Sequence, residues 1–237
     1  MISKAKLKEL AAYRLQKRQD EEGVFVVEGP KMAAEALQSG AEVVCTCATA
    51  EWRGSGAGEC HEVSPAELER LSLMRTPNQV WMLVRRGCVA PSGGAALTLA
   101  LDRLQDPGNL GTIMRTADWY GVRRIVCSRD TASCYNAKAV QASMGAVFRT
   151  TVEYTDLPQW LAGCGMPVYG ATLHGQPLGG AVEGAAVLLV GNEGRGISPE
   201  AMEHVTHPVT IPNMGGTAES LNAAVATAIL IDKMIGR

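Results

Sequence analysis

The feature that most constrains the fold of this chain is a regular alternation of strand-like and helix-like segments from Ala95 onward. Apolar, strand-like runs lie at 97–101, 124–128, 147–152, 167–171, 185–190 and 209–211, and helical patterns lie at 110–120, 136–143, 157–164 and 219–235. Parallel strands need long crossover connections, usually helices. The alternation therefore predicts an α/β domain with a mostly parallel sheet and helices on both faces.

The residues before this region form a shorter and different pattern. It predicts a basic helix at the N-terminus, strands at 24–27, 43–48 and 80–85, and helices at 30–38 and 65–73. A run containing Pro91, Ser92, Gly93 and Gly94 follows, and this composition is typical of an interdomain linker. We therefore divide the chain into a small α/β domain at 1–90, a linker at 91–96 and a second domain at 97–237.

Composition narrows the class of protein. The chain has 237 residues with 46% hydrophobic content, which is ample for a core, and no apolar run approaches the length of a membrane span. The Lys-rich N-terminus is not followed by an apolar segment, so no signal peptide is expected. We expect a soluble, cytoplasmic protein.

The cysteines and histidines show no metal-binding spacing. The seven cysteines include no CxxC pair, and the four histidines are dispersed. Cys45 and Cys47 stand two apart in an apolar run, where alternate residues of a strand share a face. We interpret them as strand residues and expect neither a disulfide framework nor a metal site.

The net charge of −2 argues against a protein that grips nucleic acid over its whole surface, so any RNA contact must be local. One candidate is the N-terminal strip of Lys4, Lys6, Lys8, Arg14, Lys17 and Arg18, in which Glu9 is the only acid. This strip could bind phosphates or form an ordinary solvated helix face. Lys31 is a further candidate, because it lies in the first turn of a predicted helix after a glycine and a proline.

Three loops that follow predicted strands carry the polar residues suited to a site. Asn109 and Arg115 lie in the first loop and helix, Gly191, Asn192 and Glu193 in the second loop, and Ser220 and Asn222 in the third. In a parallel sheet, such loops gather at the carboxyl edge, where ligands bind. The second loop lacks the lysine of a P-loop, and the first lacks GxGxxG spacing. Purely structural roles remain open: Asn109 and Ser220 as helix caps and Glu193 as a loop brace.

Together these loops resemble the three signature motifs of the SpoU (TrmH-like) RNA ribose 2′-O-methyltransferases of the SPOUT superfamily. The resemblance implies a C-terminal trefoil knot formed by the second and third loops. Residues 14–36, centred on Gly23 to Lys31, resemble the RNA substrate-binding domain that often precedes SpoU catalytic domains, a fold shared with small ribosomal RNA-binding proteins. This match implies that the N-terminal domain binds RNA.

The resemblance also implies roles for individual residues. S-adenosyl-L-methionine is expected at Thr172, Leu173, Gly191, Asn192, Glu193, Ile211 and Leu221. Arg115 is expected to contact the substrate phosphate and stabilise the developing alkoxide, with Asn109 orienting Arg115 or the ribose. Glu193 is expected to organise the polar network or the knot, and Ser220 with Asn222 to hold the reacting nucleotide.

The implied activity is methylation of a ribose 2′-hydroxyl in RNA by a homodimer that associates through the knot region. Ribosomal RNA is the expected substrate, because an RNA-binding domain precedes the catalytic one, and transfer RNA is the alternative. A non-catalytic RNA-binding or ribosome-assembly protein remains open, since one extra residue between Pro212 and Ser220 departs from the usual third motif. The basic N-terminus disfavours a small-molecule enzyme.

Overall fold

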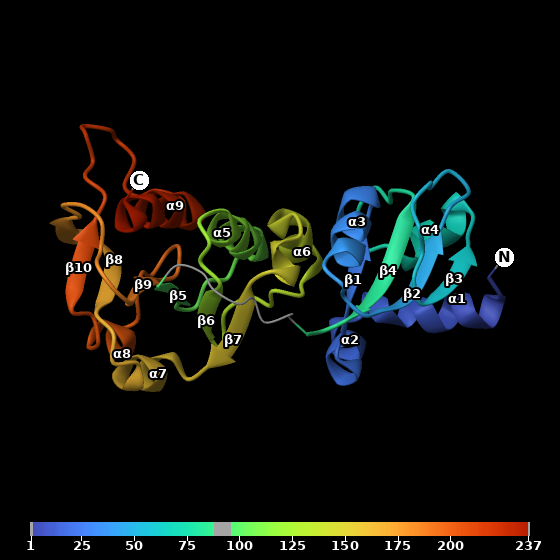
Figure 1. Ribbon diagram of the computed structural model, residues 1–237, viewed down its shortest axis with the longest axis horizontal. Coiled ribbons are helices and arrows are strands. Elements are labelled where there is room, and N and C mark those ends of the chain that lie inside the picture. Colours follow the sequence, from blue (N-terminus) through green and yellow to red (C-terminus); the bar gives the residue numbers. More distant parts are fainter. Residues whose placement is uncertain (1, 88–95, 237) are drawn as a thin grey trace.

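A computed structural model describes residues 2–87 and 96–236, which form two sheets with helices around them (Figure 1). The predicted boundary at residue 90 and nearly all of the predicted linker at 91–96 lie outside the described residues. None of the described helices is long and apolar enough to cross a bilayer.

The N-terminal sheet has four strands in the order β1-β4-β2-β3. These strands are β1 (Val24–Glu28), β2 (Val43–Ala48), β3 (Glu59–Glu62) and β4 (Val80–Arg85). β4 pairs antiparallel with β1 and β2, whereas β3 pairs parallel with β2 at the edge. β3 was not predicted, because its sequence Glu-Cys-His-Glu lacks the apolar pattern of a strand and all four residues lie outside the core.

Two groups of helices cover the faces of this sheet. α1 (Lys4–Ala11) and α4 (Pro65–Leu71) bury Leu7 and Leu10 with Trp81 on one face, and α3 (Pro30–Gln38) packs on the other. The basic N-terminal segment is not one helix, because Leu15 adopts an extended conformation between the 3₁₀ turn Ala12–Arg14 and α2 (Gln16–Glu22).

The second sheet contains six strands, all parallel, in the order β10-β8-β9-β5-β6-β7. They are β5 (Leu97–Leu101), β6 (Arg124–Ser128), β7 (Thr151–Thr155), β8 (Val168–Pro177), β9 (Ala186–Val190) and β10 (His207–Thr210). The central strands β5 and β9 are buried on both faces. The predicted parallel α/β architecture is thus confirmed.

Helices cover both faces of the second sheet, as predicted. α5 (Pro107–Trp119), α6 (Ala137–Ser143) and α9 (Ala223–Ile235) share one core with Leu99, and α7 (Leu157–Gly163) and α8 (Pro199–Met202) share another with Ala100. Successive residues of β5 therefore face opposite layers, which explains why all of its residues, including Thr98, are buried. In Figure 1, α5 and α9 lie above the sheet, and α7 and α8 below it.

Two predicted elements of the second domain have different bounds in the structure. The strand expected at 147–152 is divided between a 3₁₀ turn, Ala146–Phe148, and β7, because Met144 and Gly145 adopt left-handed conformations that turn the chain. The final helix begins at Ala223, not at 219. Asn222 caps it by accepting hydrogen bonds from the main-chain nitrogens of the next turn.

The two domains pack directly against each other. Phe25 of β1 lies 4.9 Å from the Tyr135 ring and 5.8 Å from the Phe148 ring, measured between ring centroids. Gln141 Nε2 of α6 donates to the Glu28 carbonyl at 2.8 Å. These contacts join the face of the N-terminal sheet that carries α3 to the α6 side of the second domain (Figure 1).

Candidate active site

The carboxyl ends of β5, β8, β9 and β10 and the N-termini of α5 and α9 surround one region of the second domain. β9 inserts between β8 and β5, so the strand order changes direction at the β5–β9 pair. Crevices at such switch points are the usual ligand sites of open parallel sheets.

The three predicted loops meet there through a continuous chain of side-chain hydrogen bonds. Asn222 Nδ2 donates to Asn109 Oδ1 at 3.0 Å, and Asn109 Nδ2 donates to Glu193 Oε1 at 3.0 Å. The structure therefore brings Asn109, Glu193 and Asn222 together from three loops that are distant in sequence. Asn109 occupies the centre because an amide both accepts and donates.

The first loop is held in place by its own helix cap. Asp106 caps α5 by accepting a hydrogen bond from the Asn109 main-chain nitrogen at 2.9 Å. Lys138 Nζ binds the other Asp106 oxygen at 2.7 Å. The Lys138 hydrogen bond and, next, the Asn109 N–H hold the pKa of Asp106 below its ordinary value, so the cap stays charged at neutral pH. Asn109 was a candidate for the N-cap of α5, but Asp106 fills that role.

The second loop is a tight turn built by glycine and one asparagine. Asn192 and Gly196 exchange main-chain hydrogen bonds of 2.9 Å, while Asn192 Oδ1 accepts from the nitrogens of Gly194 and Arg195 at 3.0 Å. A side chain at Gly191 would place Cβ 2.2 Å from the Gly196 carbonyl carbon, so only glycine fits. The Asn192 side chain thus fixes the conformation of this loop. The main chain of the same loop was predicted to bind the cofactor.

Asp102 holds the end of this loop in place, although it was not among the predicted site residues. It is buried, and its Oδ2 accepts from the Ser198 main-chain nitrogen at 2.6 Å. The next residue, Arg103, has a left-handed φ of 56° and accepts a hydrogen bond at its carbonyl oxygen from Asn192 Nδ2 at 2.8 Å. A carboxylate directly after a buried strand was the available sequence signal.

A cavity of about 1220 Å³ opens beside these loops. All seven residues predicted to bind the cofactor line it, as does Ser220: Thr172, Leu173, Gly191, Asn192, Glu193, Ile211 and Leu221. The volume exceeds the roughly 300–1,000 Å³ of common small-molecule sites, leaving space for a nucleotide beside a cofactor. Its walls combine apolar side chains with the main chain of glycine-rich turns, which suits a ligand with an adenine ring and polar substituents.

The third loop is the open side of this cavity. Residues 212–222 are exposed and project beyond the sheet between β10 and α9 (Figure 1). Asn213 organises the tip, because its Oδ1 accepts from the Gly215 and Gly216 main-chain nitrogens at 2.9 and 2.7 Å. The segment with the extra residue is therefore an exposed turn that leaves the neighbouring strand and helix intact.

Arg115 lies outside this assembly. Its side chain is exposed on α5, six residues after Asn109 and hence about 9 Å further along the helix axis. Its side chain forms no ion pair or hydrogen bond with the described residues, and it does not line the cavity. The side-chain hydrogen bonds of Asn109 go to Glu193 and Asn222.

The basic residues predicted to bind RNA do not form one surface. Lys4 and Lys8 are exposed on α1, but Lys6 Nζ lies 2.8 Å from Glu59 Oε2. The other members of the strip also have partners within the chain: Arg14 with the Arg70 carbonyl, Lys17 with Glu21 and Arg18 with Glu22. Lys31 lies in the first turn of α3, on the opposite face of the sheet from α1. Lys4, Lys8 and Lys31 therefore remain the better RNA candidates.

Comparison with known proteins assigns both domains to families. Residues 96–232 match the SpoU rRNA Methylase family, and residues 4–81 match the MRM3-like substrate binding domain. The 23S rRNA (guanosine(2553)-2′-O)-methyltransferase RlmP of Bacillus subtilis is 32% identical to this chain, with 98% of this chain and 96% of the relative covered.

Solved structures agree along the whole chain. A TrmH-family protein from Porphyromonas gingivalis is 37% identical, with a TM-score of 0.86 over 99% of this chain and 98% of the other. The AdoMet-bound rRNA methyltransferase from Sinorhizobium meliloti is 28% identical, with a TM-score of 0.83 over 98% and 95% of the two chains. With three linked motif loops, a cavity at the switch point and these full-length similarities, the chain belongs to the SpoU rRNA methylase family.

Proposed function

We propose that this protein methylates the ribose 2′-hydroxyl of a guanosine in 23S ribosomal RNA, using S-adenosylmethionine. The observation that carries the proposal is the Asn222–Asn109–Glu193 chain, which joins all three motif loops beside a cavity large enough for a cofactor and a nucleotide. We propose 23S rRNA as the substrate and guanosine as the methylated nucleoside because two relatives are named as 23S rRNA guanosine 2′-O-methyltransferases.

The cavity residues fit the cofactor in chemical terms. The main chain at Gly191 to Glu193 would hold its adenosine part, and Leu173, Ile211 and Leu221 would pack on its apolar surfaces. When bound, S-adenosylmethionine supplies an electrophilic methyl group attached to a sulfonium. The residues of this chain then have to place the ribose oxygen in line with that methyl group, and such positioning is a large part of catalysis.

The hydrogen-bonded amides are suited to hold the nucleotide. Asn222 and Ser220 stand on the exposed side of the site, and Ser220 lines the cavity. Glu193 keeps Asn109 in one orientation, because Oε1 accepts the Asn109 amide hydrogens only when the amide nitrogen faces it. Asn109 in turn holds Asn222, so the three loops keep one arrangement before RNA binds.

Arg115 acts on the substrate in this proposal. A guanidinium stays protonated in proteins, so it serves as a cationic contact to the phosphate and to the developing alkoxide and does not remove the proton. It is exposed and forms no ion pair with the residues that the structure describes, so it is available for RNA. Because it lies apart from the cavity of its own chain, we further propose that it completes the site of a second protomer.

A homodimer through the knot region provides that arrangement. Leu173, Met214, Leu221 and Val225 are large apolar residues with between 48% and 94% of their surface exposed, and three of them line the cavity. Association would cover them and close the open side of the site. We also propose that the loops at 191–196 and 211–222 form the trefoil knot that the family resemblance implies.

The test combines binding with product mapping. Calorimetric titration with S-adenosylmethionine should give about one site per chain, and purified protein should methylate a 23S rRNA transcript at a single ribose. Glu193→Ala should lose methylation, whereas the control Glu203→Ala should not, because Glu203 is an exposed residue that follows α8 and does not line the cavity. If the protein methylated transfer RNA and not 23S rRNA, transfer RNA would be its substrate. Binding of 23S rRNA without cofactor binding or methylation would favour the non-catalytic alternative.

A further inference from the structure

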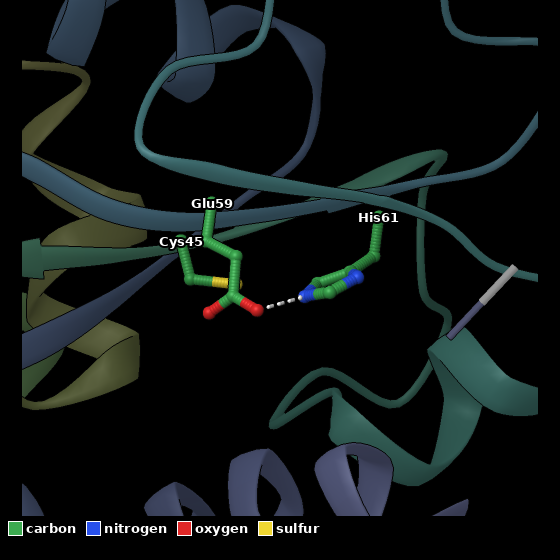
Figure 2. Close-up of side chains that lie close together, drawn as sticks. All are labelled: Cys45, Glu59 and His61. Carbon is green, nitrogen blue, oxygen red and sulfur yellow. Dashed lines mark ion pairs between the residues drawn. The ribbon is translucent and has the colours of Figure 1, made fainter. Parts of the chain in front are cut away.

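Cys45, Glu59 and His61 form a cluster in the N-terminal domain (Figure 2), whereas the methyltransferase site lies in the second domain (Figure 1). Cys45 belongs to β2, and Glu59 and His61 to β3. The parallel register pairs Cys45 with Glu59 and Cys47 with His61, so all three side chains of the cluster leave the same face of the sheet. Their donor atoms lie within 4.8 Å of one another.

We propose that this cluster binds one zinc ion, or a divalent transition metal of similar preference. Thiolate, imidazole and carboxylate are the three ligand types that zinc uses in proteins. At Zn–S distances of about 2.3 Å and Zn–N or Zn–O distances of about 2.0 Å, tetrahedral geometry separates ligand atoms by roughly 3.3–3.6 Å. The cluster reaches this spacing with side-chain adjustments of about an ångström, and water takes the fourth position.

The histidine supplies an independent observation. His61 Nε2 is buried and has no hydrogen-bond partner, although Glu59 Oε1 lies 3.0 Å away. Figure 2 shows the two atoms as an ion pair, although their geometry is not that of a hydrogen bond. A metal ion between them would give the imidazole nitrogen and the carboxylate oxygen one directed bond each.

Neighbouring groups leave the donor atoms facing the cluster. Lys6 Nζ binds Glu59 Oε2 at 2.8 Å, which fixes the carboxylate and keeps Oε1 turned toward His61. The Cys47 thiol is hydrogen-bonded to Cys45 within the same core. Such outer contacts orient ligands in established metal sites. Cys45 is buried while Glu59 is exposed, so the ion has access from the Glu59 side.

Sequence spacing concealed this set of ligands. Cys45 and Cys47 form no CxxC motif, and β3, which carries Glu59 and His61, was not predicted. Only the pairing of β2 with β3 places residues 45, 59 and 61 together. An ion here would link these two strands at the sheet edge and lock the face that α1 covers.

The experiment uses the untagged full chain after treatment with a chelator. Titration with Zn²⁺ by calorimetry, and with Co²⁺ by absorption, should show one ion per chain with a thiolate-to-Co²⁺ charge-transfer band. Cys45→Ser should abolish that band, and His61→Ala should weaken binding at least about 10- to 100-fold, the range seen even for outer-shell changes. Cys60→Ser is the matched control, because Cys60 lies on β3 between Glu59 and His61 but points to the other face and is exposed.

Three results would overturn the proposal. They are no uptake of either ion, an equal loss in Cys60→Ser, and Co²⁺ binding without a thiolate band. Circular dichroism reports whether each variant folds. If Cys45→Ser fails to fold, His61→Ala decides alone, because His61 is at the edge of the sheet and outside the hydrophobic core.

Discussion

Asn222 donates a hydrogen bond to Asn109 across 113 positions of sequence and thereby fixes the N-terminus of α9 against the first turn of α5. At the opposite ends of the same helices, the Tyr120 hydroxyl donates to Asp232 Oδ1 at 2.9 Å. The two helices therefore run parallel with their N-termini side by side, and Ala223 at the start of α9 lines the cavity. Two positive helix ends at one place favour the phosphate of an RNA substrate.

The rate of methyl transfer should depend on both the charge and the size of the side chain at Asn109, which lies between Glu193 and Asn222. Asn109→Ala loses both hydrogen bonds, each worth about 1 kcal/mol, so we expect methyl transfer to fall roughly 10- to 100-fold. Asn109→Asp should be worse than Asn109→Ala, because it sets a carboxylate 3.0 Å from Glu193. Single-turnover methylation of a 23S rRNA transcript measures both variants. An aspartate variant as active as wild type would contradict the role of this network.

Arg115 should affect chemistry without affecting stability. Its side chain is exposed and unpaired within the described residues, so Arg115→Ala should change the free energy of unfolding by less than about 0.5 kcal/mol. If it contacts the reacting nucleotide, methyl transfer should drop about 10²- to 10³-fold. Urea unfolding and methylation assays separate the two effects.

The control for Arg115 is Arg123→Ala. Arg123 Nη1 forms a 2.5 Å ion pair with Asp118 on the same helix as Arg115. Its removal should lower stability and leave the rate of the folded enzyme nearly unchanged. Full activity in Arg115→Ala would exclude Arg115 from the mechanism.

Glu28 should make stability depend on pH. It is buried next to the interdomain contact, and burial raises the pKa of its carboxyl above the ordinary 4.5, although Ser72 and the Leu73 nitrogen bind it. A raised folded-state pKa means that its stabilising contribution is full below pH 4.5 and is lost as pH rises through the folded value. Glu28→Gln removes this titration.

The measurement is urea unfolding of wild type and Glu28→Gln at pH 4.5, 6 and 7.5. We expect the variant to gain stability relative to wild type as pH rises, because all other carboxyls are shared and cancel in the difference. Two parallel stability curves would show that Glu28 titrates normally in the folded protein.

Val225 tests the proposed dimer without altering the cavity lining. It is 48% exposed in the first turn of α9, and a glutamate there would have to be desolvated in an interface through this face. Val225→Glu should shift the protein to monomers in light scattering. If Arg115 completes the partner's site, methylation should fall with the dimer fraction.

The matched control is Leu15→Glu, which changes a 66% exposed leucine in the N-terminal domain. It should keep the oligomeric state of wild type. A Val225→Glu protein with the wild-type mass would place any interface elsewhere.

The polar loops of the second domain could be predicted in part. Asn109, Glu193 and Asn222 were all singled out, because each follows a buried strand or opens a helix at the edge where ligands bind. Their pairing could not be predicted, since hydrogen-bond partners 84 and 113 positions apart depend on strand order. The same limit applies to Asp102, whose partner Ser198 belongs to a loop after another strand.

The sequence by itself determined the type of fold and most of its elements, because the period of apolar residues is a local property of the chain. β9 is apolar throughout, and β5 is apolar except at the buried Thr98, because both faces of a central parallel strand are covered. Local pattern failed where polar residues form a strand by pairing at an edge, as at β3, and where positive φ at Met144 and Gly145 turns an apolar run.

Only the tertiary structure decided which side chains act together. It joined Asn109 to Glu193 and Asn222, separated Lys31 from the basic residues of α1, and placed Cys45 beside Glu59 and His61. The physical reason is that sites are formed by contacts between segments, and those contacts follow from strand order and register. A residue's own sequence neighbourhood does not contain either of them.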